Sequence, residues 1–514
     1  MIRKLSAALI LSLSLCLAAR AQYAENPPRD TVQTAVLSLE DALRIALSEN
    51  VSVKVADMEI KRTTYAKRGT YAALFPQINA TGSYQRTIKK QIMYMGGDDD
   101  SSSEGKGGGG MASMFASAMD PINYYIQEII KGTGLLIPPY TPPTTDETQS
   151  SSSNEGFAVG RWNSFNGGVS AAMPLINFQL WESISLAGKA CELAVEQARS
   201  SRLETVTQVK QSYYAVLMAK EAFSVYKDVY ENAVENFGQT EKRYMVKKAS
   251  ELDYARAKAN VANAIPNVYN AESAVILALW QLKAVMGIDL DTDIDTMGSL
   301  GDYATHMLYD ITEGERASLD YNTTMRQLAI QAEQLASTVK IQTYANLPTL
   351  SVNFSYSMNA MTNDFNFAEY RWTPYSFVGL SLSIPIFTGL KNLNSVRQAK
   401  VQQQELDLQR INTERQLRIG IRQHLNTMET NMKSYYAAGE AVEMAQKAYD
   451  ISEKSYNVGK STITDLNDAQ LVLTQSKLSA SQAIYNFMVA KANLEQMLGH
   501  DWIDDQGNVD LENR

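Results

Sequence analysis

Apolar and aromatic side chains recur every seven residues along two stretches of the chain, and the two stretches lie 212 positions apart. The first ladder contains Val209, Val216, Phe223, Tyr230, Phe237 and Tyr244, followed by Tyr254, Val261, Val268, Val275 and Leu282. The second contains Ile421, Met428, Tyr435, Val442, Tyr449 and Tyr456, followed by Leu466, Leu473, Ala480, Phe487 and Leu494. A sustained seven-residue repeat predicts long helices wound as coiled coil, and its recurrence predicts an internally duplicated protein.

The repetition also covers the segments around the ladders. Pro76 and Pro348 match at an offset of 272, whereas Gly287 and Gly499 match at 212. The offset falls by 60 because the first half carries an insertion at about residues 95–160, which is rich in Gly, Ser and Asp. Such a composition cannot bury enough apolar surface to order itself, so the insertion is predicted to be a loop.

Each half is predicted to run helix, strand, strand, long helix, turn, helix. The two repeats are predicted at residues 22–290 and 291–500, ahead of a polar tail at residues 501–514. The long helices and the helices that return from them are predicted at residues 178–248, 250–286, 389–458 and 462–498. A helix of about seventy residues is about 105 Å long. Each half is therefore predicted to form a rod about 100 Å long.

Residues 1–21 are typical of a secretory signal peptide. Arg3 and Lys4 precede an apolar stretch, and Ala21 completes a cleavage site of the A-x-A kind. Cys16 lies within this signal, which leaves Cys191 as the single cysteine of the mature chain. One cysteine cannot form an internal disulfide, so export here brings no disulfide framework.

The charge and the hydropathy of the chain exclude two classes of protein. The formal net charge of −9 becomes −12 when the signal, with Arg3, Lys4 and Arg20, is removed. An acidic chain without a large basic cluster argues against nucleic-acid binding. After the signal no run of eighteen uncharged apolar residues exists, which excludes spanning helices. A membrane protein would then have to be a β-barrel.

Four short segments show the alternation that a barrel strand requires. They are predicted at about residues 77–87, 163–174, 349–359 and 376–385. One face of each is mostly apolar and the other is small and polar, as the lipid-facing and lumen-facing sides of a spanning strand need to be. A pair of half-buried hairpins in a soluble domain is the alternative interpretation of this alternation.

The number of strands bears on the number of chains. Four strands cannot close a barrel, and an open edge in lipid leaves backbone groups without hydrogen bonds. Two chains would give an eight-stranded barrel filled by side chains, whereas three would give twelve strands and an aqueous lumen. The small polar residues on one face favour three chains. The predicted fold is thus mainly α, with a membrane β-barrel that a trimer shares.

The chain resembles the TolC-type outer-membrane factors over about residues 35–500. The resemblance rests on the opening Leu39-Glu40-Asp41-Ala42-Leu43, on Pro385-Ile386-Phe387 where a strand returns to a helix, and on the segment from Tyr456 to Ala469. It implies a homotrimer in the outer membrane, with a twelve-stranded barrel that continues into an α-helical tunnel through the periplasm. It also implies a periplasmic adaptor and an inner-membrane pump of the RND or ABC type, and a function in efflux or type I secretion.

The resemblance places the gate of the tunnel at the two turns between paired helices. Asp465 and Asp468 are three residues apart at the start of a helix, so both carboxylates lie on one face. The resemblance implies that they form the constriction together with Asp253. Crowded carboxylates attract cations and raise each other's pKa values. The alternative is helix capping, because an aspartate near a helix N-terminus is favoured in any protein.

Neighbouring residues are predicted to hold the gate closed or to contact the adaptor. They are Tyr456, Gly459 and Lys460 in the second half and Arg243, Lys247 and Lys248 in the first. The two turns differ, because Lys247 stands where the second half has Gly459. Opening is predicted to be an untwisting of the helix pairs that breaks polar contacts near these turns.

The sequence offers no support for catalysis. No nucleophile motif, zinc motif, phosphate loop or dinucleotide fingerprint is present, and His306, His424 and His500 are far apart in sequence. No cofactor and no metal are therefore predicted. Two alternative functions are a trimeric coiled-coil adhesin, which would place its strands at the C-terminus, and a passive porin, which would need many more strands.

Overall fold

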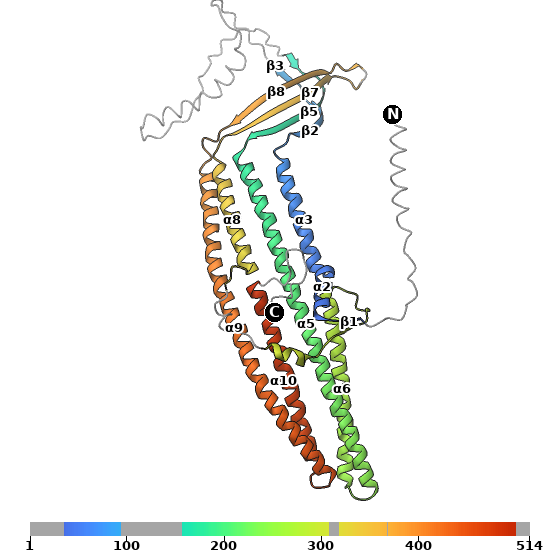
Figure 1. Cartoon of the computed structure of the whole chain (residues 1–514). Helices are drawn as coiled ribbons and strands as arrows, with labels where there is room; N and C mark the ends of the chain where they lie inside the picture. Colours follow the sequence, from blue (N-terminus) through green and yellow to red (C-terminus); the bar gives the residue numbers. More distant parts are fainter. Residues whose placement is uncertain (1–34, 94–156, 308–317, 367–368, 500–514) are drawn as a thin grey trace, which may run out of the picture. The chain divides into compact units, whose positions relative to one another are not determined.

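Helices of matching length recur in the two halves of the chain (Figure 1). The helices α5 (Phe178–Met245) and α9 (Lys391–Asn457) contain 68 and 67 residues. Each is followed by a helix of 36 residues, α6 (Glu251–Met286) or α10 (Ile463–Leu498). The prediction of a duplicated, mainly α fold is confirmed.

The computed structural model describes residues 35–93, 157–307, 318–366 and 369–499. The predicted signal peptide, most of the insertion and the polar tail lie outside these residues. The other helices and strands of the described part are β1 (Ala35–Leu37), α2 (Leu39–Glu49), α3 (Val51–Ala72), β2 (Gln77–Arg86), β3 (Gln91–Met93), β4 (Phe157–Val159), β5 (Asn163–Ile176), β6 (Ile294–Thr296), the 3-10 helix η2 (Leu300–His306), α8 (Thr323–Tyr344), β7 (Thr349–Thr362) and β8 (Thr373–Ser383). None of the described helices is long and apolar enough to cross a membrane.

The described residues form two compact units, one helical and one built on a sheet. The sheet has four strands in the order β2-β5-β7-β8. The strands β2 and β5 are antiparallel, and Gln77 pairs with Ala172 at one end and Arg86 with Asn163 at the other. The short antiparallel pair β3-β4 uses residues 157–159, which fall within the range predicted for the insertion. The strand β8 begins at Thr373, three residues before the predicted start.

The seam between α5 and α6 is lined by alanine. Ala257, Ala264, Ala271 and Ala278 recur every seven residues along α6, and all four are buried. Each follows a member of the aromatic and β-branched ladder by three residues, so the two sets occupy the two inward positions of a heptad. In this helix only Leu282 of the ladder is buried. The sequence prediction found one inward position of α6 and missed the alanine position.

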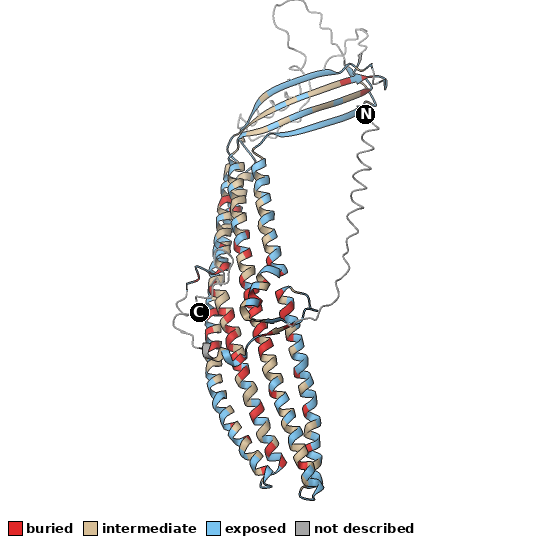
Figure 2. Ribbon diagram, turned by 45° about the vertical axis from the view of Figure 1, so that its right-hand side comes forward, coloured by how far each residue is buried: buried red, intermediate tan, exposed pale blue. Residues whose placement is uncertain are grey.

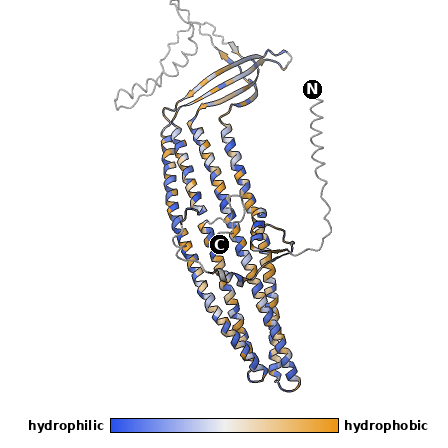
Figure 3. Ribbon diagram, viewed as in Figure 1, coloured by the Kyte–Doolittle hydropathy of each residue, from blue (hydrophilic) through white to orange (hydrophobic). Residues whose placement is uncertain are grey.

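Buried residues concentrate in two regions of the helical unit (Figure 2). The larger lies midway along the helices, around β1, β6 and η2, and contains fully buried Val209, Val216, Leu282 and Phe487. The smaller cluster lies near the turns that follow α5 and α9. Between these regions hydrophilic and hydrophobic residues alternate along each helix (Figure 3), as expected for helices that bury one stripe.

Two asparagines join the short helices end to end. The Asn50 side chain donates to the Val285 carbonyl at 2.6 Å, and the Asn322 side chain donates to the Met497 carbonyl at 2.6 Å. Each asparagine also caps the helix that it precedes, since Asn50 Oδ1 accepts from Ser52 N at 2.7 Å. The start of α3 is thus bonded to the end of α6, and the start of α8 to the end of α10. The two short helices of each half are therefore joined end to end.

A left-handed glycine completes each of these joints. Gly287 ends α6 with φ 75°, and Gly499 ends α10 with φ 70°. A Cβ atom on Gly499 would lie 2.1 Å from the Tyr321 carbonyl oxygen, and one on Gly287 would lie 2.7 Å from the Glu49 carbonyl oxygen. Both positions therefore require glycine for their backbone conformation and for the space beside them.

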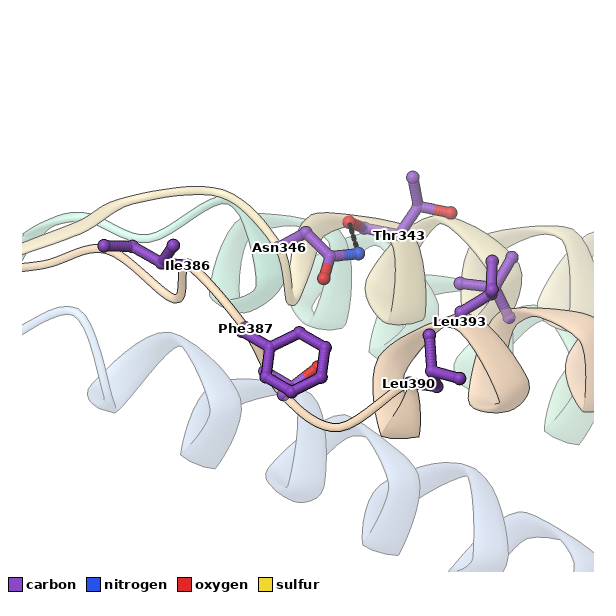
Figure 4. Close-up of a pocket in the computed structure, with 8 residues that line it drawn as sticks. Thr343, Asn346, Ile386, Phe387, Leu390 and Leu393 are labelled. Carbon is purple, nitrogen blue, oxygen red and sulfur yellow. Dashed lines mark hydrogen bonds between the residues drawn. The ribbon is translucent and has the colours of Figure 1, made fainter. Parts of the chain in front are cut away.

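An apolar hollow of about 400 Å³ lies where α8 ends and α9 begins (Figure 4). Asn392 fixes this junction by donating to Asn346 Oδ1 at 2.9 Å. The side chains of Ile386 and Phe387 are 95% and 81% exposed in the single chain. Exposed apolar patches on a protein surface are typical of sites that contact another protein or a membrane.

Candidate functional site

The two turns that follow α5 and α9 have the same backbone hydrogen bonds. In the first turn Lys247 N donates to Tyr244 O at 2.9 Å, and Lys248 N donates to Arg243 O at 2.7 Å. In the second, Gly459 N donates to Tyr456 O at 3.0 Å, and Lys460 N donates to Ser455 O at 2.8 Å. These pairs correspond at the offset of 212. The structure places the two turns side by side at one end of the helical unit (Figure 1).

The residue at the centre of each turn has a left-handed conformation. Gly459 has φ 76°, which costs glycine little, and Lys247 has φ 58°. The backbone therefore follows the same path in both turns, although Lys247 stands where the second half has Gly459. This difference places a lysine side chain, exposed in the single chain, at the tip of the first helix pair.

The aspartates predicted at the gate cap the helices that follow the turns. Thr462 N donates to Asp465 Oδ2 at 2.9 Å, and Asp465 N donates to Thr462 Oγ1 at 3.2 Å. Ser250 and Asp253 form the same reciprocal box in the first half. Hydrogen bonds from the Thr462 backbone and hydroxyl lower the pKa of Asp465. In the single chain its pKa thus shifts in the direction opposite to that predicted for a crowded ring.

Capping does not remove the carboxylates from the surface. Asp465 and Asp468 are both exposed, one turn apart on the same face of α10. Asp253 is half-buried. An aspartate such as Asp465 can therefore cap its helix and still contribute charge to the surface of the tip.

An arginine of the first helix pair bonds to the end of the second. Arg243 Nη1 donates to the Tyr456 carbonyl at 2.8 Å, and Arg243 Nη2 donates to the Asn457 carbonyl at 2.5 Å. The guanidinium also lies over the Tyr456 ring, 5.1 Å from its centroid. Charge-assisted bonds of this kind are roughly twice as strong as neutral ones. Two of the predicted latch residues, Arg243 and Tyr456, are thus brought together.

Two further contacts close to the turns join the helix pairs, and the sequence prediction missed them. The Thr240 and Tyr456 hydroxyls are 2.5 Å apart, and both residues are buried. Arg256 Nη1 donates to Thr464 Oγ1 at 3.3 Å, which joins α6 to α10. Thr240 could have been found from its position, because it is a polar residue three places after Phe237 in the heptad, where an apolar residue is expected.

The remaining predicted latch residues are exposed. Within the described part of the chain, Lys247, Lys248 and Lys460 make no side-chain hydrogen bond or ion pair, although their backbone amides hold the turns. The predicted latch residues therefore fall into two groups. Arg243 and Tyr456 bond within the chain, whereas the lysines present free ammonium groups at the tips. No three His, Cys, Asp or Glu side chains in the described residues are grouped to hold a metal ion.

The cap predicts a pH dependence at the start of α10. Because the folded pKa of Asp465 is lowered from its ordinary value of 3.8, its contribution is present above that value and is lost as the pH falls through the folded pKa. We expect the Leu466 amide, which donates to Thr462 O at 3.3 Å, to lose hydrogen-exchange protection over that range, after correction for intrinsic rates. The Asp465→Asn variant should lose this dependence, and Asp468→Asn should keep it. Identical pH profiles for all three proteins would contradict the assignment.

The chain is similar in sequence to known outer-membrane proteins. The sequence profile of the family described as Outer membrane efflux protein matches residues 144–288 and 316–500. The Escherichia coli outer membrane protein TolC is 21% identical over 351 residues, which cover 66% of this chain and 70% of that protein. The alkaline protease secretion protein AprF of Pseudomonas aeruginosa is 20% identical over 368 residues, covering 71% of this chain and 76% of its own length.

Solved structures show the same fold. The Campylobacter jejuni CmeC outer membrane channel superposes with a TM-score of 0.64 at 15% identity, covering 96% of this chain and 94% of that one. The open state of the Neisseria gonorrhoeae MtrE outer membrane channel gives a TM-score of 0.63 at 17% identity, covering 93% and 96%.

Proposed function

The chain belongs to the outer membrane efflux protein family and is an outer-membrane channel of an efflux or secretion system, and from this premise we propose that its helix tips form the channel's periplasmic gate. It is located in the outer membrane and extends into the periplasm. Channels of this family are homotrimers that work with an adaptor and an inner-membrane pump, and they are not known as enzymes. We assign the chain a periplasmic adaptor that contacts the tips and a pump of the RND or ABC type.

The exposed apolar surface of the single chain supports a trimer that shares one barrel. Val378, Leu380 and Leu382 point to one side of β8 and are 74%, 71% and 61% exposed. The outer strands β2 and β8 each have an unpaired edge. Three sheets joined edge to edge would pair these edges in a twelve-stranded barrel. Ile386 and Phe387 would then face lipid or a neighbouring subunit.

The bonds of Arg243 to the end of α9 are the observation that carries the gate. They connect the tip of α5-α6 to the tip of α9-α10, and they involve few residues at an exposed end of the molecule. The two helix pairs can therefore separate there without disrupting the larger core midway along the helices. Separation of the pairs would widen the lumen at the tips, and the carboxylates of Asp465, Asp468 and Asp253 would line the opening.

Removing charge from the tip tests this assignment. We expect Asp465→Asn with Asp468→Asn to weaken block by divalent cations at least about tenfold in single-channel recordings, because threefold symmetry gathers these carboxylates around one axis. Asparagine keeps the shape of each side chain and can still accept the capping bond. The matched control removes two exposed carboxylates from the shaft of α9, Asp407→Asn with Glu440→Gln. Unchanged block in the tip variant, or equal loss in the control, would refute the gate assignment.

A further inference from the structure

In the described part of the sheet unit, the charged residues gather at one end of the strands. Within β2, β5, β7 and β8 the single charged residue is Arg86, the last residue of β2. The connecting segments in the described part of this unit carry four more bases and two acids. These are Lys89, Lys90, Arg161 and Arg371, with Asp364 and Glu369. The described part of the unit therefore carries five basic residues and two acidic ones.

Hydrogen bonds bring these connecting segments together. Thr87 N donates to the Trp162 carbonyl at 2.8 Å, and Trp162 N donates to Asn363 Oδ1 at 3.2 Å. Thr373 Oγ1 donates to the Asn359 carbonyl at 2.9 Å, which holds the start of β8 beside the end of β7. Figure 1 shows β7 and β8 joined at the end of the sheet where β2 ends and β5 begins. We call Arg86, Lys89, Lys90, Arg161 and Arg371 the basic rim.

Aromatic side chains accompany the basic rim. The Lys90 ammonium lies 4.7 Å from the centre of the Trp162 ring. Trp162 and Trp372 are 40% and 41% exposed, and each directly follows an exposed arginine of the rim. Tryptophan is favoured where a membrane protein meets the headgroup region, and a lysine stem that lies along a ring can keep its charge in that region. The rim thus pairs interfacial rings with cations.

We propose that the basic rim binds the phosphate-bearing headgroups of the lipid leaflet that surrounds the barrel. This rests on the proposed function, which puts the sheet in the outer membrane. The other end of the sheet continues into α3, α5, α8 and α9, so the rim belongs to the leaflet away from the periplasmic helices. Arginine and lysine bind phosphate through short charge-assisted hydrogen bonds. A trimer would repeat the rim around the whole barrel.

The size of the effect follows from the charges. One basic side chain near an anionic surface strengthens association roughly fivefold. Four exposed ones, Arg86, Lys89, Arg161 and Arg371, would together strengthen it well over tenfold. Salt should weaken this binding, because raising the ionic strength from about 0.01 M to about 1 M shortens the screening length from roughly 30 Å to roughly 3 Å.

The test uses the full chain, purified in neutral detergent, and a bisphosphorylated lipid A with its dephosphorylated form as the comparison. The rim variant changes four residues to glutamine, R86Q, K89Q, R161Q and R371Q. The control variant removes the same charge from exposed positions of α9, R397Q, K400Q, R410Q and R415Q. We expect the unaltered chain and the control to bind the phosphorylated lipid at least about tenfold more tightly than its dephosphorylated form, and the rim variant to bind both alike.

Several results would overturn the proposal. They are equal binding of both lipids by the unaltered chain, unchanged binding by the rim variant, equal loss in the control variant, and binding of inorganic phosphate as tight as that of the lipid. Affinity that does not fall with salt would also overturn it, and that measurement needs no variant. Single-channel conductance, recorded for the same proteins, separates this proposal from the channel function. A rim variant that conducts normally but has kept its lipid affinity refutes the rim alone.

Discussion

Replacing Gly499 with alanine is expected to destabilise the folded, assembled chain severely. The new Cβ atom would lie 2.1 Å from Tyr321 O and 2.6 Å from Tyr321 C, both backbone atoms that cannot move aside alone. The left-handed φ of 70° adds strain for any residue other than glycine. We expect a loss of about 4 kcal/mol or more, which is a large part of the 5–15 kcal/mol that typically stabilises a domain.

Alanine substitutions at two other glycines should change the stability by different amounts. Gly287→Ala at the equivalent joint meets backbone at 2.7 Å, so its cost should be smaller than that of Gly499→Ala but still measurable. Gly439 lies in the interior of α9 with open space around it, and Gly439→Ala should gain about 0.5–1 kcal/mol. The yield of trimer and its thermal midpoint would measure all three. A Gly499→Ala protein within about 1 kcal/mol of the unaltered chain would contradict the structure of this joint.

Replacing Arg243 with alanine is expected to open the channel. The change removes the bonds to the Tyr456 and Asn457 carbonyls and the contact with the Tyr456 ring. A hydrogen bond to a charged group contributes about 1.5–3 kcal/mol, and 1.4 kcal/mol is a factor of ten in a closed-to-open equilibrium. We therefore expect the open fraction in single-channel recordings to rise about tenfold or more.

The neighbouring lysine supplies the control for this variant. Lys242→Ala removes the same charge from an exposed position one residue away, and it should leave the open fraction unchanged. Tyr456→Phe removes only the contact with the Thr240 hydroxyl and should open the channel less than Arg243→Ala. The two changes combined should have less than their summed effect, because both act on one contact between the same helices. Equal behaviour of Arg243→Ala and Lys242→Ala would exclude a latch at this position.

Much of this architecture follows from periodicity. The seven-residue ladders predict α5, α6, α9 and α10, and the offset of 212 predicts that the two turns match residue by residue. Helix capping is the alternative that the sequence offers for Asp465 and Asp468, because the helix dipole favours an aspartate near a helix N-terminus. The structure shows the more specific reciprocal box at Asp465 and at Asp253. Local sequence carries this information, since each cap involves residues at most three positions apart.

Other features depend on contacts that no local pattern encodes. The strands β1 and β6 contain three residues each and pair across more than 250 positions, too short for alternation to be recognised. The partner of Arg243 is a carbonyl, and any residue would provide one, so the sequence at Asn457 gives no sign of it. The ladder of aromatic and β-branched residues does not reveal the alanine seam of α6, although close approach of helices favours alanine.

The joints at Asn50 and Asn322 have a mechanical consequence. Each divides the short-helix side of a rod into two segments, beside a long helix that runs past the joint unbroken, and the segment between joint and tip contains the 36 residues of α6 or α10. At 1.5 Å per residue that segment is a lever about 54 Å long. A rotation of about 5° at the joint would therefore displace the tip by about 5 Å, roughly the rise of one helical turn. Torque applied midway along the molecule would be amplified into an aperture change at its end.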